Sequence, residues 1–160
     1  MRIGCSAGSA EHQARNGSSG FTGIADANVV VSPGGKMSCY LAILATIDPA
    51  SQAAGAISSG WVSVANHLGF LAMVQTGTLG TGATVDAKLQ QALDSAGTGA
   101  KEISGKAITQ IVKATGDNKQ ALINLKPEDL DIVNGFGFVR VALTVGVAAS
   151  ITGAQFFGMP

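Results

Sequence analysis

The residues that could do chemistry are few and widely spaced. His12 and His67 are the only histidines, and Cys5 and Cys39 are the only cysteines. Neither histidine stands at a recognisable spacing from a serine, a cysteine or an acidic residue that it could activate as a base. Two histidines and two scattered cysteines also lack the ligand spacing of a zinc site. We therefore expect no catalytic residue, no metal site and no enzymatic activity.

Two other stretches resemble binding motifs only in part. The run Gly77–Gly82 (GTLGTG) is glycine-rich like a phosphate-binding loop, but no Gly-Lys-Ser/Thr follows it and it does not open a helix. A Ca²⁺ loop needs more oxygen ligands at regular alternate positions than Glu128, Asp129 and Asp131 supply. We interpret the first as a flexible loop and the second as a solvated helical turn. The sequence therefore predicts no cofactor.

The charge content is low and balanced. Charged residues make up 12% of the chain, about half the usual ~25%. Ten Lys and Arg residues balance ten Asp and Glu residues, so the net charge is zero. Because like-charge repulsion keeps freely diffusing proteins apart, we interpret this balance as a sign that much of the surface is buried in an assembly. A small soluble domain from a low-charge proteome is the alternative.

The charge distribution also argues against two classes of partner. No run of Lys or Arg makes the basic footprint that binding to nucleic acid requires, and no polybasic stretch points to an anionic membrane. The apolar runs are far shorter than the ~20 residues of a membrane span. We therefore expect neither nucleic acid nor a membrane among the partners.

The N-terminal segment differs in composition from the rest. Residues 1–27 are rich in Gly, Ser and Ala and cannot bury enough apolar area to offset their ordering entropy. They predict a flexible arm ahead of one folded domain at 28–160. The arm is either a disordered tail or a segment that becomes ordered on a partner, and it has no apolar core of a secretory signal. Cys39 is expected to be a small buried hydrophobe, with a Cys5–Cys39 disulfide as the alternative.

The clearest structural pattern runs from Gly137 to Val147 (GFVRVALTVGV). Side chains on a strand point to opposite faces in turn, so a period of two indicates a strand with one apolar face. A helix would need apolar residues at i, i+3, i+4 and i+7. The predicted apolar face consists of Val139, Val141, Leu143, Val145 and Val147. It must pack against a second sheet or a helix.

The sequence predicts further strands and turns in the rest of the chain. Strands are predicted at Asn28–Val31, Lys36–Ile47, Trp61–Asn66, Gly69–Thr76, Ala107–Lys113, Gln120–Leu125 and Ser150–Phe157. Asp48-Pro49 is expected to end the second of these, and a loop to continue to Gly60. The strands Trp61–Asn66 and Gly69–Thr76 are expected to pair with one another, the latter lying centrally because it is apolar on both faces. Lys126–Leu130 is expected to form a single helical turn that begins with a proline.

Local pattern leaves the segment Ala83–Asp94 (ATVDAKLQQALD) open. Val85, Ala87 and Leu89 fit a strand, whereas Val85, Leu89 and the pair Ala92-Leu93 fit a helix equally well. The surrounding strands favour a strand here too. The succession of strands separated by turns predicts an all-β fold, either an antiparallel β-sandwich or a barrel. Among the possible topologies, the jelly-roll is favoured.

The second half of the chain resembles a family of phage proteins. The similarity lies in LAMVQTGTLGTGATVDAKLQQALDSAGTGAKEISGKAITQI and DNKQALINLKPEDLDIVNGFGFVRVALTVGVAAS, and the match covers roughly Gly69 to Gln155. These stretches are similar to small tailed-phage virion proteins, among them head cement or decoration proteins built as jelly-roll β-sandwiches. The family carries no catalytic motif, and the N-terminal third of this chain departs from its pattern. The resemblance implies that Ala83–Asp94 is a strand.

The resemblance also implies a structural role on a phage head. A cement protein binds the outside of the capsid and bridges subunits of the major capsid protein, so this chain would lie on the virion surface after assembly in the host cytoplasm. Symmetric placement would favour self-association as a dimer or a trimer. We expect the interface to include Arg2, Arg15, Phe21, Ile24 and Trp61. Phe21 and Ile24 could anchor the end of the arm, whereas a tryptophan at a strand start is most often part of a core or a domain edge.

Three other functions stay open at this point. A head-spike base, a portal-vertex protein or a tail component could use the same sandwich. A carbohydrate-binding module usually places several exposed aromatic residues on one face, and only 5% of this chain is aromatic. An enzyme is the least favoured, because no catalytic constellation is evident.

Overall fold

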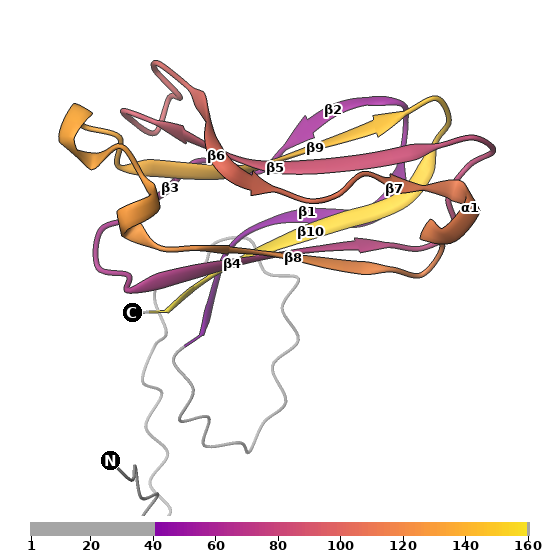
Figure 1. Cartoon of the computed structure of the whole chain (residues 1–160), viewed down its shortest axis with the longest axis horizontal. Coiled ribbons are helices and arrows are strands. Elements are labelled where there is room, and N and C mark those ends of the chain that lie inside the picture. The colour runs from indigo at the N-terminus through magenta and orange to yellow at the C-terminus, as the bar shows by residue number, and fades with distance from the viewer. Residues whose placement is uncertain (1–40, 160) are drawn as a thin grey trace, which may run out of the picture. The chain divides into compact units, whose positions relative to one another are not determined.

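The structure, a computed structural model, describes residues 41–159 of the chain. Within this range two antiparallel β-sheets pack face to face (Figure 1). The prediction of an all-β antiparallel sandwich is therefore confirmed. Some predictions fall outside the described residues: the arm at 1–27 and its boundary with 28–160, the strand Asn28–Val31, the start of Lys36–Ile47, and the positions of Cys5, Cys39 and His12.

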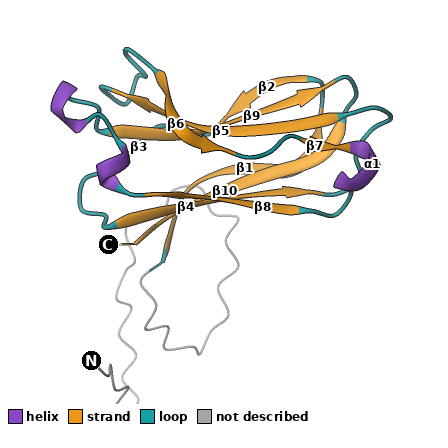
Figure 2. Ribbon diagram, viewed as in Figure 1, coloured by secondary structure: helices purple, strands orange, loops and turns teal. Residues whose placement is uncertain are grey.

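The two sheets, named A and B here, are each built around a long C-terminal strand. Sheet A has the order β1 (Ala42–Gln52), β10 (Ser150–Met159), β4 (Gly69–Thr76) and β8 (Gln120–Leu125). Sheet B has the order β2 (Gly55–Ser58), β9 (Phe138–Gly146), β5 (Thr84–Ala92) and β6 (Lys101–Ala107), with β3 (Val62–Ser63) also on β9 and β7 (Ile111–Val112) also on β5. Short helical segments lie at the ends of the sandwich (Figure 2): α1 (Lys113–Gly116), η1 (Pro127–Asp129) and η2 (Ile132–Asn134).

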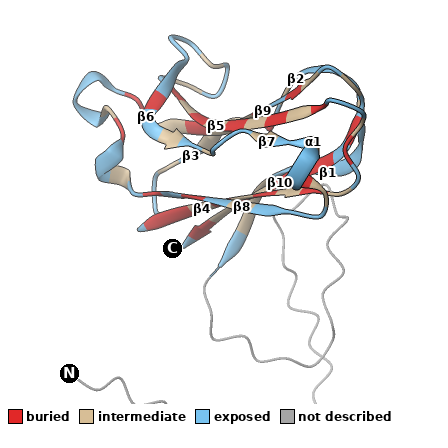
Figure 3. Ribbon diagram, turned by 45° about the vertical axis from the view of Figure 1, so that its right-hand side comes forward, coloured by how far each residue is buried: buried red, intermediate tan, exposed pale blue. Residues whose placement is uncertain are grey.

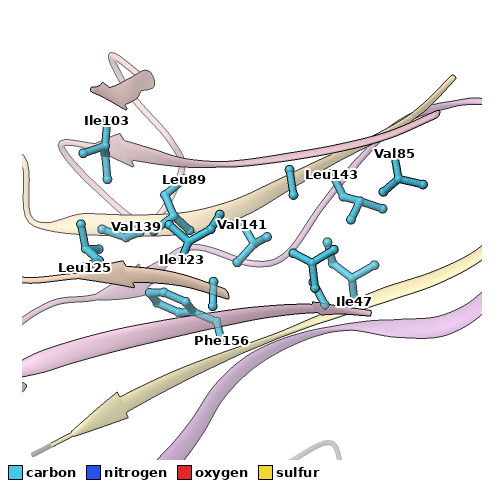
Figure 4. Close-up of a cluster of buried hydrophobic side chains, with 14 of the residues drawn as sticks. Ile47, Val85, Leu89, Ile103, Ile123, Leu125, Val139, Val141, Leu143 and Phe156 are labelled. Carbon is cyan, nitrogen blue, oxygen red and sulfur yellow. The ribbon is translucent and has the colours of Figure 1, made fainter. Parts of the chain in front are cut away.

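The core lies between the two sheets and begins with the apolar face of β9. This face is at most 2% exposed and comprises Val139, Val141, Leu143 and Val145. It packs with buried residues of β5 and with the inner faces of β4, β8 and β10 (Figure 4). On the sheet A side, the rings of Phe70 and Phe156 stack with their centroids 5.5 Å apart. Fully burying each such side chain contributes about 1.5–3 kcal/mol, so these alternating positions bind the layers together (Figure 3).

Several strand predictions agree with the structure. Gly69–Thr76 and Gln120–Leu125 form β4 and β8 with the predicted bounds, and β4 lies inside sheet A between β10 and β8. The open segment Ala83–Asp94 contains strand β5, whose residues alternate between buried and half-buried for most of its length. The predicted turn Lys126–Leu130 contains η1, where the Asp129 carboxylate accepts a hydrogen bond from the Lys126 amide at 2.8 Å.

The prediction that Asp48-Pro49 ends a strand is wrong. Strand β1 continues to Gln52, with a break in register between Ile47 and Ala50 where it pairs with β10. A proline is tolerated here because β1 is an edge strand, whose outer N–H groups need no partner in the sheet. Gly153 makes room for the bulge, since a Cβ on it would lie 2.8 Å from the Ile47 carbonyl oxygen and from Pro49 backbone atoms.

The predicted loop up to Gly60 and the predicted pairing of Trp61–Asn66 are also wrong. Residues Gly55–Ser58 form β2 on the edge of β9, although only Ile57 gives this strand an inward apolar side chain. The strand after Gly60 shortens to Val62–Ser63, which pairs with β9 instead of β4. The chain then crosses to sheet A through a turn in which Asn66 has a φ of 67°. Asparagine is among the few residues that adopt this left-handed conformation readily.

Two further bounds differ because turns replace predicted strand residues. In Ala107–Lys113, β6 ends at Ala107, β7 holds only Ile111–Val112, and α1 begins at Lys113. Val147 does not join the apolar face of β9: it is 76% exposed, with a φ of 68°. The Ala148 amide donates a hydrogen bond to the Gly146 carbonyl at 2.8 Å, which is the i to i+2 bond of a γ-turn. The turn reverses the chain before β10 starts.

The close contact at Gly153 predicts a matched pair of glycine variants. A Cβ at Gly153 meets backbone atoms at 2.8 Å, whereas a Cβ at Gly137 meets nothing within 4 Å. We expect G153A to lower the free energy of unfolding by about 1–3 kcal/mol, because backbone must move to accommodate the methyl group. G137A should change it by less than about 0.5 kcal/mol. Urea denaturation followed by circular dichroism measures both, and equal effects of the two variants would contradict the packing of β1 on β10.

Candidate functional site

The outer face of sheet A, turned away from sheet B, is the most distinctive surface of the described residues. Side chains alternate along each strand, so the register assigns them to this face from the buried positions of their neighbours. The outward residues are Gly69, Leu71, Met73 and Gln75 of β4, Gln120, Leu122 and Asn124 of β8, Ile151, Gly153, Gln155, Phe157 and Met159 of β10, and Ile43, Thr46 and Ser51 of β1. We call this set the uncharged face, because it contains no Asp, Glu, Lys or Arg. The one charged residue of these four strands is the exposed Asp48, which lies in the bulge of the edge strand β1 beside Pro49.

Apolar side chains form a continuous stripe across the uncharged face. Phe157 pairs with Leu71 on one side and with Ile43 on the other, and Met73 pairs with Leu122. Leu122 is 59% exposed, and no described element packs over the stripe (Figure 1). A monomer rarely leaves a large contiguous apolar patch open unless it is an interaction site. Amide side chains border the stripe, so the face suits a partner surface that is apolar and uncharged.

The sequence contains one signal of this face. The segment Gly69–Thr76 is apolar on both faces, which predicts a strand covered on both sides. The inner side, with Phe70 and Val74, is buried by sheet B, whereas Leu71 and Met73 on the outer side are only half-buried. The pattern therefore predicts the position of β4 in its sheet correctly. The additional apolar side is the signal that could have revealed the uncharged face.

The outer face of sheet B carries charged and hydrogen-bonded side chains instead. Arg140 of β9 donates from Nε to Gln90 Oε1 of β5 at 2.9 Å. The Arg140 guanidinium carbon also lies 4.5 Å from the centre of the Trp61 ring. Gly97 approaches this indole so closely that a Cβ would lie 2.5 Å from Trp61 Nε1. Trp61 is thus held between β9 and the β5–β6 loop, on the opposite sheet from the uncharged face.

The other predicted interface residues lie outside the described range. They are Arg2, Arg15, Phe21 and Ile24. Of the five predicted residues the structure therefore describes only Trp61, and their contact with a partner stays a prediction. Trp61 has packing partners within its own domain, which account for its burial.

A small open hollow lies on the outer side of sheet B. Its volume is about 280 Å³, and its lining includes Asp86 and Lys88 of β5 and Thr144 of β9. Asp86 already accepts a hydrogen bond from Gln110 Nε2 at 2.8 Å, and Lys88 forms an ion pair with Glu102. Because both charged groups have partners, the hollow leaves few free polar groups to orient a ligand.

The acidic cluster at η1 is paired with lysines. Lys106 Nζ lies 2.7 Å from Asp129 Oδ2, and Lys101 Nζ lies 2.5 Å from Asp131 Oδ2. Glu128 pairs with a neighbouring lysine at 3.1 Å. The bond from Lys106 is the main cause of a lowered pKa at Asp129, and the bond from Lys101 has the same effect on the pKa of Asp131. These carboxylates therefore fasten the η1–η2 segment to β6.

The glycine-rich run Gly77–Gly82 uses its amides within the fold. The Leu79 amide donates to Asp117 Oδ1 at 2.9 Å, and the Gly80 amide donates to Ser150 Oγ at 3.1 Å. A phosphate-binding loop instead directs successive amides toward one empty point. In this protein the run joins β4 to β5 and anchors them to the start of β10.

His67 and the remaining polar groups give no sign of a reactive site in the described part. The His67 ring packs 5.4 Å from the Phe70 ring, and its Nδ1 lies 3.0 Å from the Ala65 carbonyl oxygen. Among residues 41–159, no three His, Cys, Asp or Glu side chains gather as a metal ion would require. No helix in this range is long and apolar enough to cross a membrane.

Comparison of the chain with protein-family models, with curated proteins and with solved structures gives no match. The candidate site therefore depends on the geometry of the described residues. Their most unusual feature is the uncharged face.

The ion pairs at η1 predict acid-sensitive stability. The pKa values of Asp129 and Asp131 are lowered in the folded protein, and those of Asp94 and Asp117 are lowered by the Thr98 amide and by Lys113 respectively. A lowered folded pKa contributes stability above the unfolded value of about 3.9, and that stability is lost as the pH falls through the folded pKa. We therefore expect the Tm to fall progressively below about pH 5.

The double variant D129N/D131N provides the control for this pH dependence. It removes two of the titrating groups, so its Tm should be lower at pH 7 and should fall less steeply in acid. Thermal unfolding followed by circular dichroism between neutral and acid pH measures both slopes. Identical slopes for the variant and the natural chain would contradict the assignment of the lowered pKa values to these ion pairs.

Proposed function

We propose that this protein is a non-enzymatic structural protein that docks onto a partner through the uncharged face of sheet A. The observation that carries the proposal is the apolar stripe through Phe157, Leu71, Met73 and Leu122, which no described element covers. Docking removes apolar area from water, which is favourable by roughly 25 cal/mol per Å². It requires no desolvation of a charged group within the apolar stripe, because the charge nearest to it in these strands is Asp48 in the bulge of the edge strand β1.

The partner that we propose is the major capsid protein on the outside of a phage head. The resemblance to head cement proteins extends from Gly69 to Gln155, a range that holds β4, β8 and most of β10. These three strands supply most of the uncharged face. A protein that bridges capsid subunits against internal pressure needs a rigid module with a large neutral interface, and the two packed sheets provide one. In this proposal the chain lies on the virion surface as a cement or decoration protein.

The order of strand pairing supports the jelly-roll topology that the resemblance implies. A jelly-roll is a long antiparallel hairpin of eight strands wrapped into two sheets, so its first strand pairs with its last and the pairing continues inward. Here β1 pairs with β10, β2 with β9, β4 with β8, and β5 with β6. Treating β3 and β7 as short additions, we interpret the sandwich as a jelly-roll.

The size of the uncharged face suggests that docking needs a second contact. Eight residues of β4 and four strands correspond to a flat area of roughly 26 by 19 Å, or ~500 Å². Standard interfaces bury ~800 Å² per partner. Residues 1–40 are joined to β1, an edge strand of the same sheet, and we propose that they supply the remaining contact.

Charge substitution on the uncharged face tests the docking proposal. M73K places an ammonium in the middle of the apolar stripe, whereas T144K places the same group on the exposed outer side of sheet B. We expect M73K to weaken binding to expanded, emptied phage heads at least about tenfold, because the charge must be desolvated. T144K should bind like the natural chain. Co-sedimentation with heads of the phage that encodes the protein measures both affinities.

Two results would contradict the cement proposal. If the natural chain fails to sediment with the heads, the alternative placements at a vertex, a spike base or the tail become favoured. If M73K and T144K bind equally well, the interface lies elsewhere. Both variants must first show the Tm of the natural chain, so that loss of binding is not loss of folding.

Removal of the N-terminal arm gives an independent prediction. We expect a chain that lacks Met1–Ala27 to keep the Tm of the sandwich, because this Gly-, Ser- and Ala-rich segment has too little apolar area to contribute to a core. Its affinity for emptied heads should fall, because most of the segment proposed to make the second contact is removed. The two measurements are thermal unfolding and the same co-sedimentation assay. An unfolded truncated chain would contradict the division at residue 27.

A further inference from the structure

Strand β8 is the one regular sheet edge in the described range that has no protective feature. It ends sheet A beyond β4, and its sequence QALINL contains no charged residue, proline or glycine. Proteins usually block such edges with charges, prolines, bulges or short strands, because an open edge pairs with another strand. An edge without these features is therefore a candidate pairing site.

The other three edges carry the usual protection. Strand β1 has two breaks in register and contains Asp48-Pro49. Strand β6 contains Lys101, Glu102 and Lys106, and its pairing with β5 is interrupted near Gly105, which has a φ of 71°. Strand β2 has only four residues. The contrast singles out β8.

The free hydrogen-bonding groups of β8 can be assigned from its pairing with β4. The Thr76 amide donates to the Lys119 carbonyl at 2.8 Å, and bonded pairs recur at every second residue of an antiparallel ladder. Ala121, Ile123 and Leu125 therefore bond to β4. The N–H and C=O groups of Gln120, Leu122 and Asn124 point away from it, and no group within residues 41–159 bonds to them outside that ladder.

We propose that β8 pairs with β8 of a second copy of this chain, antiparallel and centred on Leu122. In this register Leu122 faces Leu122 of the second copy, and Gln120 faces Asn124. Each facing pair exchanges two backbone hydrogen bonds. The two leucines meet on the outer side, and each glutamine amide can hydrogen-bond to the asparagine amide opposite. No charged residue faces a like charge, so the edge is complementary to itself.

The alternative registers are less complementary. A shift by one residue would place outward side chains of one copy opposite inward side chains of the other, and the outer faces would no longer join. A shift by two would place Leu122 opposite the amide of Asn124 or Gln120. The register centred on Leu122 pairs apolar with apolar and amide with amide.

The consequence is one continuous sheet shared by two copies. The two uncharged faces would join side by side across the Leu122 contact and double the area presented to a partner. A pairing of six residues is smaller than a standard interface, so the dimer should dissociate on dilution. This inference does not depend on the capsid partner, because its test requires only the purified protein.

Charge swapping at Leu122 tests the proposed dimer. Leu122 is 59% exposed, so L122K and L122E should both fold. Each alone places like charges opposite one another, and we expect the dissociation constant of the dimer to rise at least about tenfold. An equal mixture of L122K and L122E should restore the dimer, because residue 122 of one copy then faces the opposite charge on the other. Sedimentation equilibrium of the full chain over a wide dilution series measures all four samples.

A control variant and a hydrogen-exchange measurement complete the test of the dimer. V133K makes the same kind of substitution at a residue that is 98% exposed and lies outside β8, and it should dimerise like the natural chain. Hydrogen exchange of the natural chain needs no variant: the Leu122 amide should exchange rapidly when dilute and slowly when concentrated. A natural chain that stays monomeric, a mixture that fails to restore the dimer, or a Leu122 amide that exchanges rapidly within a dimer would overturn the proposal.

Discussion

Burial of the alternating faces of two sheets against one another is the constraint on which the rest of the structure depends. The apolar side of β9 cannot be covered by its neighbours in sheet B, because they present their own apolar sides in the same direction. Sheet A supplies the cover, with Phe70 and Phe156 stacked opposite β9. A slip of one residue in any central strand would turn its apolar set outward. Packing across the layers therefore determines the register within each layer.

The same alternation produces two outer faces with different properties. Sheet B uses its outward positions for Arg140, Lys88 and Asp86, each held by a polar or aromatic neighbour. Sheet A carries only one charged residue, Asp48 in the bulge of its edge strand β1, and has Phe157 and Leu122 on its outer side. The charged residues of the described strands are thus unevenly distributed between the two outer faces, and the outer face of sheet A has fewer of them. The outer face of sheet B is therefore readily solvated, whereas burial of the apolar residues on the outer face of sheet A is favourable.

The edges of the sheets also differ from one another, in whether they are protected against pairing with another strand. Bulges, charges and shortness protect three of them, and the unprotected strand β8 borders the uncharged face. An apolar face and an open edge on the same sheet are complementary features: the edge provides directional hydrogen bonds and the face provides area. Protection of the other edges limits growth to one side, so pairing at β8 would end at two copies instead of continuing into a fibre.

The sequence by itself determined the elements whose pattern is local. Period-two alternation predicts most of β9, short strand-like runs bounded by turns predict β4 and β8, and Pro127 followed by acidic residues predicts the turn at η1. Tertiary structure decided the rest, because strand partners lie far apart in the chain. Gly55–Ser58 is a strand only because it pairs with Ala142–Val145, and Pro49 can stay within β1 because Gly153 faces it. Local pattern also cannot show which of two apolar faces on β4 another layer covers. That depends on where sheet B packs, so the open face became visible only in the folded chain.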